Sequence, residues 1–193
     1  MIVWALPWAL ALLALSLRHP QPIETRVMKK SILFLSVLLV SASMLQAEEA
    51  KVAVGNNGIG IPEGYKNFRL IGVSQRSDDQ TLRAILGNDV AIEAARAGKT
   101  NPWPNGTILA KLGWKHTPSD KFPAATIPGD FTRADFMIKD DVKYASTGGW
   151  GWGRWIGMEQ KPYDKADFSQ ECIACHSVVK DQDLVFTKPV KLP

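Results

Sequence analysis

Thiol and imidazole side chains are scarce in this chain of 193 residues, which contains only two cysteines and three histidines. A structural zinc site needs four such ligands, and no second Cys-X-X-Cys or His-X-X-X-His pair is present to complete one. The chain also lacks internal repeats and long linkers. Of its 23 Lys and Arg and 19 Asp and Glu, four basic residues and one acidic residue lie in residues 1–47. Residues 48–193 therefore carry a net charge of +1, which gives no support to nucleic-acid binding.

Both cysteines lie in one motif, Cys172-Ile173-Ala174-Cys175-His176. The pattern Cys-X-X-Cys-His is typical of c-type haem attachment, because two thiols at this spacing can add to the two vinyl groups of one haem. The adjacent imidazole then becomes the proximal ligand of the iron. We therefore predict one covalently bound haem c, attached through Cys172 and Cys175, with its iron on His176. The alternatives are a redox Cys-X-X-Cys with an incidental histidine, a zinc half-site and a disulfide.

The N-terminal region predicts export. Met28-Lys29-Lys30 is basic, residues 31–44 are apolar, and Ala47 precedes Glu48 at a suitable cleavage point, which is the order of a secretory signal peptide. We expect a signal peptide over residues 28–47 and a single periplasmic domain over residues 48–193. Residues 1–27 contain a second apolar run without a basic start, which we interpret as a wrongly assigned upstream start codon. The alternative is a membrane anchor, since about 17 apolar residues is the lower limit for a span.

The remaining sequence predicts an α+β fold, with about five antiparallel strands and a few helices. Runs rich in β-formers and separated by turn signals predict the strands, and capping residues mark the helices. The expected helices are 89–97, which Asn88 or Asp89 can cap, and about 165–177, a C-terminal helix that carries the haem motif. The expected strands are 67–76, 81–86, 107–115, 133–143 and 150–158.

Two of these strands have faces that bear on function. In residues 107–115, Lys111 shares a face with Leu109 and Gly113, which makes that face less polar than an ordinary solvated one. In residues 149–157 the glycines alternate with larger residues, so one face lets a flat group or another backbone approach closely. The alternative for this strand is a weak edge with exposed tryptophans.

The motifs resemble the cytochrome P-460 family and its relative cytochrome c′-beta, from about Ile61 to the C-terminus. The haem motif and the trailing Val-Phe-Thr at 185–187 match the family, and residues 105–111 resemble its Asp-Gly-Thr-X-X-X-Lys strand, with asparagine in place of the first aspartate. Arg83 resembles an arginine near the haem. Asp135 occupies the position of a distal glutamate, with a shorter side chain. The alternatives are a surface salt bridge for Arg83 and a solvated turn or strand end for Asp135.

The resemblance implies an antiparallel sheet with helices, commonly in a dimer, and a five-coordinate iron with an open distal site for small nitrogenous ligands. In P-460 members the lysine of the matched strand, here Lys111, is bonded covalently to the haem, and the protein oxidises hydroxylamine. Cytochrome c′-beta relatives bind nitric oxide without that reactivity. The resemblance makes Arg83 and Asp135 the catalytic candidates, and oxidation implies a redox partner protein.

Three functions are therefore compatible with the sequence. The first is oxidation of hydroxylamine or a related nitrogen oxide, and the second is gas binding without turnover. The third is electron transfer by an iron with a sixth ligand, for which Met137, Met158 and His116 are the candidates. The apolar strand contexts of both methionines favour core packing instead, and His116 is expected at the surface.

Overall fold

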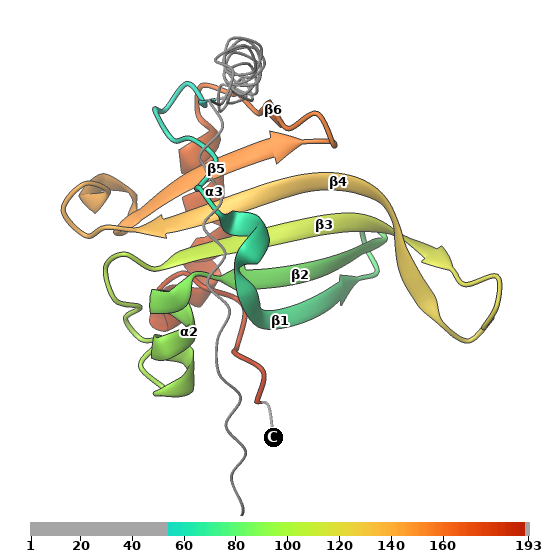
Figure 1. Cartoon of the computed structure of the whole chain (residues 1–193). Coiled ribbons are helices and arrows are strands. Elements are labelled where there is room, and N and C mark those ends of the chain that lie inside the picture. Colours follow the sequence, from blue (N-terminus) through green and yellow to red (C-terminus); the bar gives the residue numbers. More distant parts are fainter. Residues whose placement is uncertain (1–53, 192–193) are drawn as a thin grey trace, which may run out of the picture. The chain divides into compact units, whose positions relative to one another are not determined.

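The computed structural model of the protein describes residues 54–191. Its centre is a six-stranded antiparallel sheet whose strands follow one another in sequence order (Figure 1). This confirms the α+β class with one strand more than expected. Among residues 54–191, no helix is long and apolar enough to cross a membrane. The strands are β1 (Arg69–Arg76), β2 (Thr81–Gly87), β3 (Ile108–Pro118), β4 (Thr126–Lys139), β5 (Trp150–Ile156) and β6 (Lys161–Pro162).

The helices are short and lie at the ends and faces of the sheet. Helix α2 (Asp89–Arg96) connects β2 to β3, and α3 (Phe168–His176) carries the haem motif. Both fall within the ranges expected from the sequence, although α3 starts three residues later than predicted. The 3-10 helices are η2 (Tyr65–Asn67), η3 (Ala145–Thr147) and η4 (Ser177–Gln182), the last of which continues directly from α3.

The β3–β4 hairpin differs most from the prediction. Strand β4 begins at Thr126, which pairs with Pro118, and ends at Lys139. The expected range of 133–143 was therefore wrong at both ends. Residues 140–143 form a turn, because the Asp140 carboxylate accepts hydrogen bonds from the backbone N–H groups of Val142 and Lys143. The outer part of the hairpin extends beyond the neighbouring strands (Figure 1).

Helix α2 is joined to the start of β3 by its N-cap. The Asn88 side-chain oxygen accepts from the backbone N–H groups of Ala91, at 3.1 Å, and Ile108, at 3.0 Å. Its amide nitrogen donates to the Gly106 carbonyl at 2.8 Å. Of the two capping candidates, Asn88 is thus the one that caps, and it also fixes where β3 starts.

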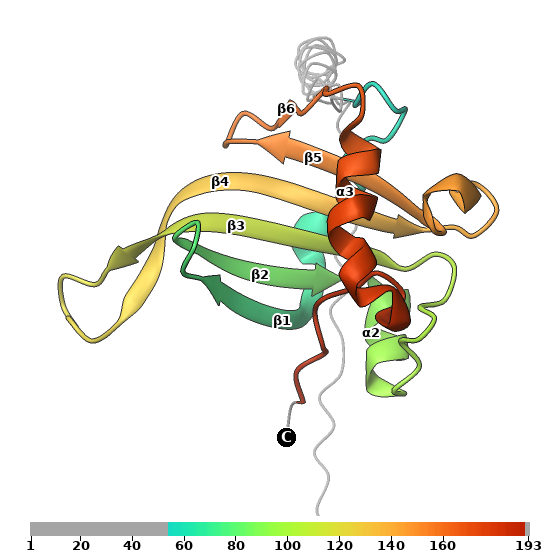
Figure 2. The same cartoon turned by 180° about the vertical axis from the view of Figure 1, so that it is seen from behind.

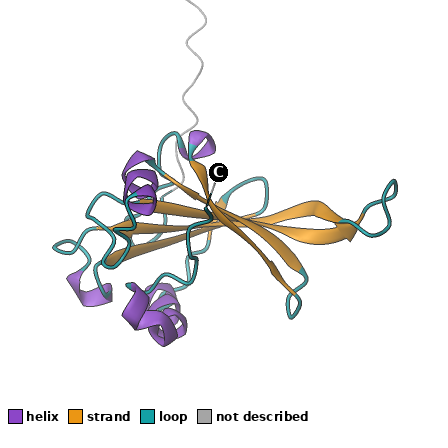
Figure 3. Ribbon diagram, turned by 90° about the horizontal axis from the view of Figure 1, so that it is seen from below, coloured by secondary structure: helices purple, strands orange, loops and turns teal. Residues whose placement is uncertain are grey.

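The two faces of the sheet have separate cores. Helix α3 crosses one face and packs there with the residues that follow it, whereas η2 covers the opposite face (Figures 1 and 2). The view along the sheet shows helices on both sides of it (Figure 3). The core on the α3 face includes Ile71, Trp103 and Trp152. The core on the η2 face includes Tyr65 and Phe136.

The tryptophans of β5 are buried rather than exposed, so the expectation of a weak edge strand with exposed tryptophans was wrong. Trp150, Trp152 and Trp155 are all 3% exposed or less, which rules out the alternative interpretation of this strand and not the glycine-lined face. The glycines of β5, which share a face with Trp155, do admit flat groups, but these are rings of the protein itself. A Cβ atom on Gly151 would lie 2.5 Å from the Tyr144 ring, and one on Gly153 would lie 2.6 Å from the Trp155 ring.

Candidate functional site

A cavity of about 580 Å³ lies between the sheet, helix α3 and the segment 185–187. This volume is in the range of ~300–1,000 Å³ that is usual for cofactor pockets. The cavity brings together all the residues that the sequence assigned to haem binding or catalysis, although they are spread over nearly a hundred positions of the chain. They are Arg83, Lys111, Asp135, Cys172, Cys175 and His176.

The strand register explains why the charged residues of the wall lie together. Lys111 of β3 pairs with Asp135 of β4, which in turn pairs with Arg154 of β5. Residues directly opposite one another in an antiparallel pair share a face and lie close together. The three side chains therefore form a row across the sheet, directed into the cavity.

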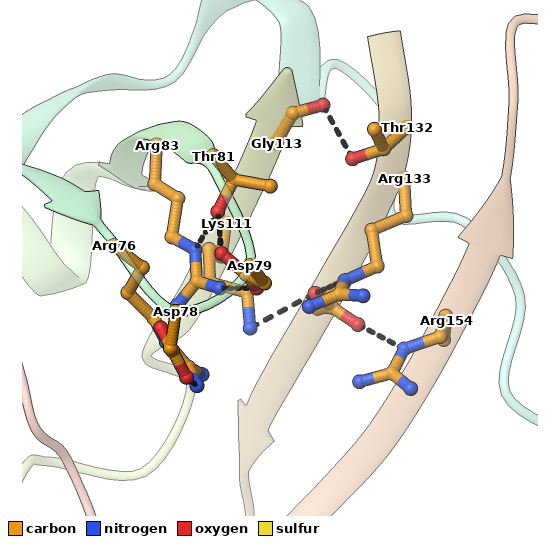
Figure 4. Close-up of polar contacts among 11 residues, drawn as sticks. Arg76, Asp78, Asp79, Thr81, Arg83, Lys111, Gly113, Thr132, Arg133 and Arg154 are labelled. Carbon is orange, nitrogen blue, oxygen red and sulfur yellow. Dashed lines mark hydrogen bonds and ion pairs between the residues drawn. The ribbon is translucent and has the colours of Figure 1, made fainter. Parts of the chain in front are cut away.

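Asp135 is the centre of an ion cluster. Its carboxylate lies 2.9 Å from Lys111 Nζ and 3.2 Å from Arg133 Nε, and it also accepts from Arg154 Nε. Dashed lines in Figure 4 mark these contacts of Lys111 and Arg154, whose side chains extend from different strands. Burial favours the neutral acid, but the charges of Lys111 and Arg154 outweigh it and hold the pKa of Asp135 below its ordinary value. Asp135 is therefore an ionised, mostly buried carboxylate in the middle of β4, and not a solvated turn or strand end.

Lys111 extends from the wall into this partly apolar setting. Its side chain is 29% exposed. Burial lowers the pKa of Lys111 from its ordinary value, because a charged ammonium is poorly solvated there, and the nearby Asp135 opposes the shift only in part. A lowered pKa increases the fraction of neutral amine, which is the form that acts as a nucleophile.

Arg83 lies in the same wall, on β2, two residues before Ile85, which is the residue that pairs with Lys111. Its guanidinium donates to the Asp79 carboxylate at 2.5 Å and to the Thr81 hydroxyl at 3.1 Å (Figure 4). The side chain is only 10% exposed. The ion pair that was expected as an alternative for Arg83 is thus present, but it fixes the guanidinium at the cavity rather than on the open surface.

Helix α3 presents the two thiols on the opposite side of the cavity. Cys172 is partly buried and Cys175 is exposed, and neither forms a disulfide. Burial raises the pKa of the Cys172 thiol to about 11. In the described part of the chain, no three side chains of the His, Cys, Asp or Glu types are grouped to hold a metal ion, so the zinc half-site finds no further ligands.

His176 ends α3 and is held in one orientation. Its Nδ1 lies 2.6 Å from the Leu184 carbonyl oxygen, and its ring packs edge-on against Trp152 and Phe186 at centroid distances of 4.7 and 4.9 Å. Since a carbonyl can only accept, Nδ1 must carry the proton, which leaves Nε2 free to bind a metal. Burial lowers the pKa of His176, which favours the neutral imidazole that acts as a ligand.

The three candidates for a sixth ligand have different positions. Met137 lines the cavity and packs partly against the core. Met158 follows β5 and is 75% exposed, so the expectation that it packs in an apolar strand was wrong; β5 ends two residues earlier, at Ile156. His116 lies in the outer part of β3, where its Nδ1 is 3.2 Å from the Gln75 amide. Only Met137 belongs to the cavity.

Haem c requires two thiols and an imidazole as donors. Here Cys172, Cys175 and His176 provide them from one helix, beside one cavity. Apolar side chains, among them Leu109, Met137 and Phe186, line the cavity beside these donors, as a flat and largely apolar macrocycle requires. The residues present therefore fit the cofactor.

A comparison with protein families agrees with this geometry, because the model of the cytochrome P460 family matches residues 62–187. The chain belongs to the cytochrome P460 family. It is accordingly a haem cytochrome of that family. A search of curated proteins found no match for it.

Sequence reasoning missed Arg133 and Arg154, which line the same cavity and form ion pairs with Asp135. Both occupy positions that alternate correctly with the cavity face of their strands, since Arg133 is two residues from Asp135 and Arg154 is two residues from Trp152. Alternation alone could have placed them on that face. Their contacts with Asp135 depend on strand register, for which the sequence contains no direct signal.

Proposed function

We propose that this cytochrome P460 carries one covalently attached haem c and oxidises hydroxylamine or a related nitrogen oxide at an open iron site. The observation that carries the proposal is the shared cavity of the haem motif and Lys111, to which Lys111 contributes a partly buried amine of lowered pKa. Cys172 and Cys175 would hold the haem and His176 would bind its iron. When bound, the haem supplies an iron that binds small nitrogen compounds and takes up electrons.

In this proposal Lys111 and Asp135 act together. Asp135 is a weak proton acceptor while Lys111, Arg133 and Arg154 all compensate its charge. A bond between the Lys111 amine and the haem would remove the positive charge of Lys111. The pKa of Asp135 would then rise, since Lys111 is the neighbouring charge that lowers it most. Asp135 would become a better acceptor for the protons that hydroxylamine loses on oxidation, with Arg83 nearby to orient the substrate.

Replacing Lys111 tests the proposal. We expect Lys111→Ala to retain thioether-bound haem but to shift the optical spectrum towards an ordinary five-coordinate c-type haem, with a large loss of hydroxylamine oxidation and persistent nitric oxide binding. Lys115→Ala is the matched control, because Lys115 lies in the same strand and is exposed. Mass spectrometry of the wild type should find a peptide containing Lys111 linked to the haem peptide. One spectrum shared by the wild type and Lys111→Ala, without a linked peptide, would contradict the proposal.

One observation favours a second function, which is nitric oxide binding without turnover. Asp135 is shorter than the glutamate expected from the family resemblance, and two arginines hold it in place besides Lys111. A carboxylate bound in this way is restricted in its approach to a ligand at the iron. Under this alternative, the wild type binds nitric oxide at the ferrous haem but produces no electrons from hydroxylamine in the presence of an artificial acceptor.

The location and partners of the protein form part of the proposal. We propose a periplasmic protein, released from its signal peptide near Glu48, that passes electrons to a redox partner protein and forms a homodimer. The calculated mass of residues 48–193 plus one haem is the expected result of intact-mass measurement on periplasmic protein. A mass that includes residues 31–47, found in the membrane fraction, would support the anchor instead.

A further inference from the structure

The backbone that receives the His176 hydrogen bond has an uncommon conformation. Leu184, whose carbonyl oxygen lies 2.6 Å from His176 Nδ1, has a φ of 64°, and the preceding Asp183 has a φ of 52°. Residues other than glycine rarely adopt this left-handed region, because their Cβ comes too close to the following carbonyl. Two such residues in a row keep their conformation only where surrounding contacts hold them.

Asp183 provides these contacts from three sides. Its carboxylate receives the Lys139 ammonium at 2.9 Å and the backbone N–H of Trp103 at 2.9 Å. Its carbonyl oxygen accepts from the Trp150 indole N–H at 2.9 Å. The turn that carries the Leu184 carbonyl is therefore attached to the end of β4, to the start of β5 and to the loop after α2.

Lys139 is the least expected member of this group. It is the last residue of β4 and only 3% exposed, with its ammonium 5.1 Å from the centroid of the Trp150 ring. Asp141 gives the ammonium a second, partly exposed partner at 3.0 Å. A buried charge is costly unless it is paired, so the position of Lys139 fixes that of Asp183. Neither Lys139 nor Asp183 lines the cavity.

We propose that the buried ion pair between Lys139 and Asp183 positions the Leu184 carbonyl and so sets the strength of the hydrogen bond donated by His176. A stronger bond from Nδ1–H increases the electron density that the imidazole gives to a metal on Nε2. This is one of the means by which a protein adjusts the reduction potential of haem iron. Lys139 and Asp183 are therefore positioning residues for the proximal ligand. The inference rests on haem ligation by His176 within the proposed function, and not on hydroxylamine oxidation.

The test is the double variant Lys139→Met with Asp183→Asn, in the haem-loaded protein. It removes one positive and one negative charge, so the net charge near the haem does not change. Asparagine tolerates the left-handed backbone, so the change acts on the ion pair. The matched control is Arg69→Met with Asp89→Asn, which removes an exposed ion pair of 2.8 Å. The readouts are the iron–histidine stretching band of the ferrous protein by resonance Raman spectroscopy and the midpoint potential.

We expect the double variant to show a lower iron–histidine frequency and a higher midpoint potential than the wild type, because a weaker hydrogen bond leaves the imidazole a poorer donor to ferric iron. The control should match the wild type. If the double variant does not fold, Asp183→Asn alone decides, since Lys139 then keeps Asp141 as a partner. An iron–histidine band at the same frequency in the wild type, the double variant and Asp183→Asn would overturn this inference and leave haem ligation by His176 in place. Retention of the wild-type band in His176→Ala would overturn both this inference and haem ligation by His176.

Discussion

At the scale of single residues, Asp135 forms ion pairs with three cations, Lys111, Arg133 and Arg154, although its side chain is only 13% exposed. Removing one partner of a buried ion pair leaves the others uncompensated. Such a change costs more than the pair itself contributes, since the remaining charges stay away from water.

Asp135 therefore predicts a pH dependence of stability. Its folded-state pKa is lowered, so its contribution is fully present above the unfolded value of about 3.9 and is lost as the pH falls through the lower folded-state value. We expect Asp135→Asn to reduce the free energy of unfolding by about 3 kcal/mol at pH 7, and the difference from the wild type to shrink below pH 4. Denaturant unfolding at several pH values measures both effects.

The control for this prediction is Asp130→Asn, which alters an exposed carboxylate of the same strand. It should follow the wild type closely at every pH. Equal losses of unfolding free energy in the two variants would show that the ion pairs of Asp135 do not stabilise the fold.

At the scale of elements, the joint between α2 and β3 depends on one side chain. Asn88 serves two backbone donors and one backbone acceptor. We expect Asn88→Ala to lower the free energy of unfolding by ~1–2 kcal/mol, as for the loss of other N-caps. Thermal unfolding of the haem-loaded protein measures this, with Asn56→Ala in an exposed loop as the control. Equal melting temperatures for Asn88→Ala and the wild type would contradict it.

The elements also show what the sequence could and could not predict. The alternation of residues in β3 placed Lys111 on a partly apolar face, and the cavity lies there. The turn at 140–143 was missed because Val142 favours a continued strand, whereas the Asp140 side chain accepts hydrogen bonds from the N–H groups of Val142 and Lys143. Strand pairing could be expected from short connections, but register could not. For this reason the contacts of Arg154, and the buried ion pair of Lys139, came only from the structure.

At the scale of the whole molecule, the α3 face of the sheet has a cavity where a core would otherwise be continuous. A cofactor that occupies it binds the folded state, so its removal should destabilise the protein. We expect wild-type haem to stay with the polypeptide under denaturing conditions. Haem in Cys172→Ala with Cys175→Ala should extract into acidic organic solvent, and the extracted protein should melt at a lower temperature than the loaded wild type.

Extraction of haem from the wild type under the same conditions would exclude thioether attachment. An unchanged melting temperature after extraction would show that the cavity does not depend on its occupant for stability.

The strictly sequential order of the sheet has a consequence for the assembly of the molecule. Each strand pairs with the one made just before it, from β1 through β6, and the haem motif follows them all. Pairings between neighbours in sequence need little loop closure and form readily, and the strands are synthesised before the haem motif. The wall that bears Lys111 and Asp135 can thus be complete before Cys172 arrives. Helix α3, which is made after the six strands, then closes the cavity against a sheet that has already formed.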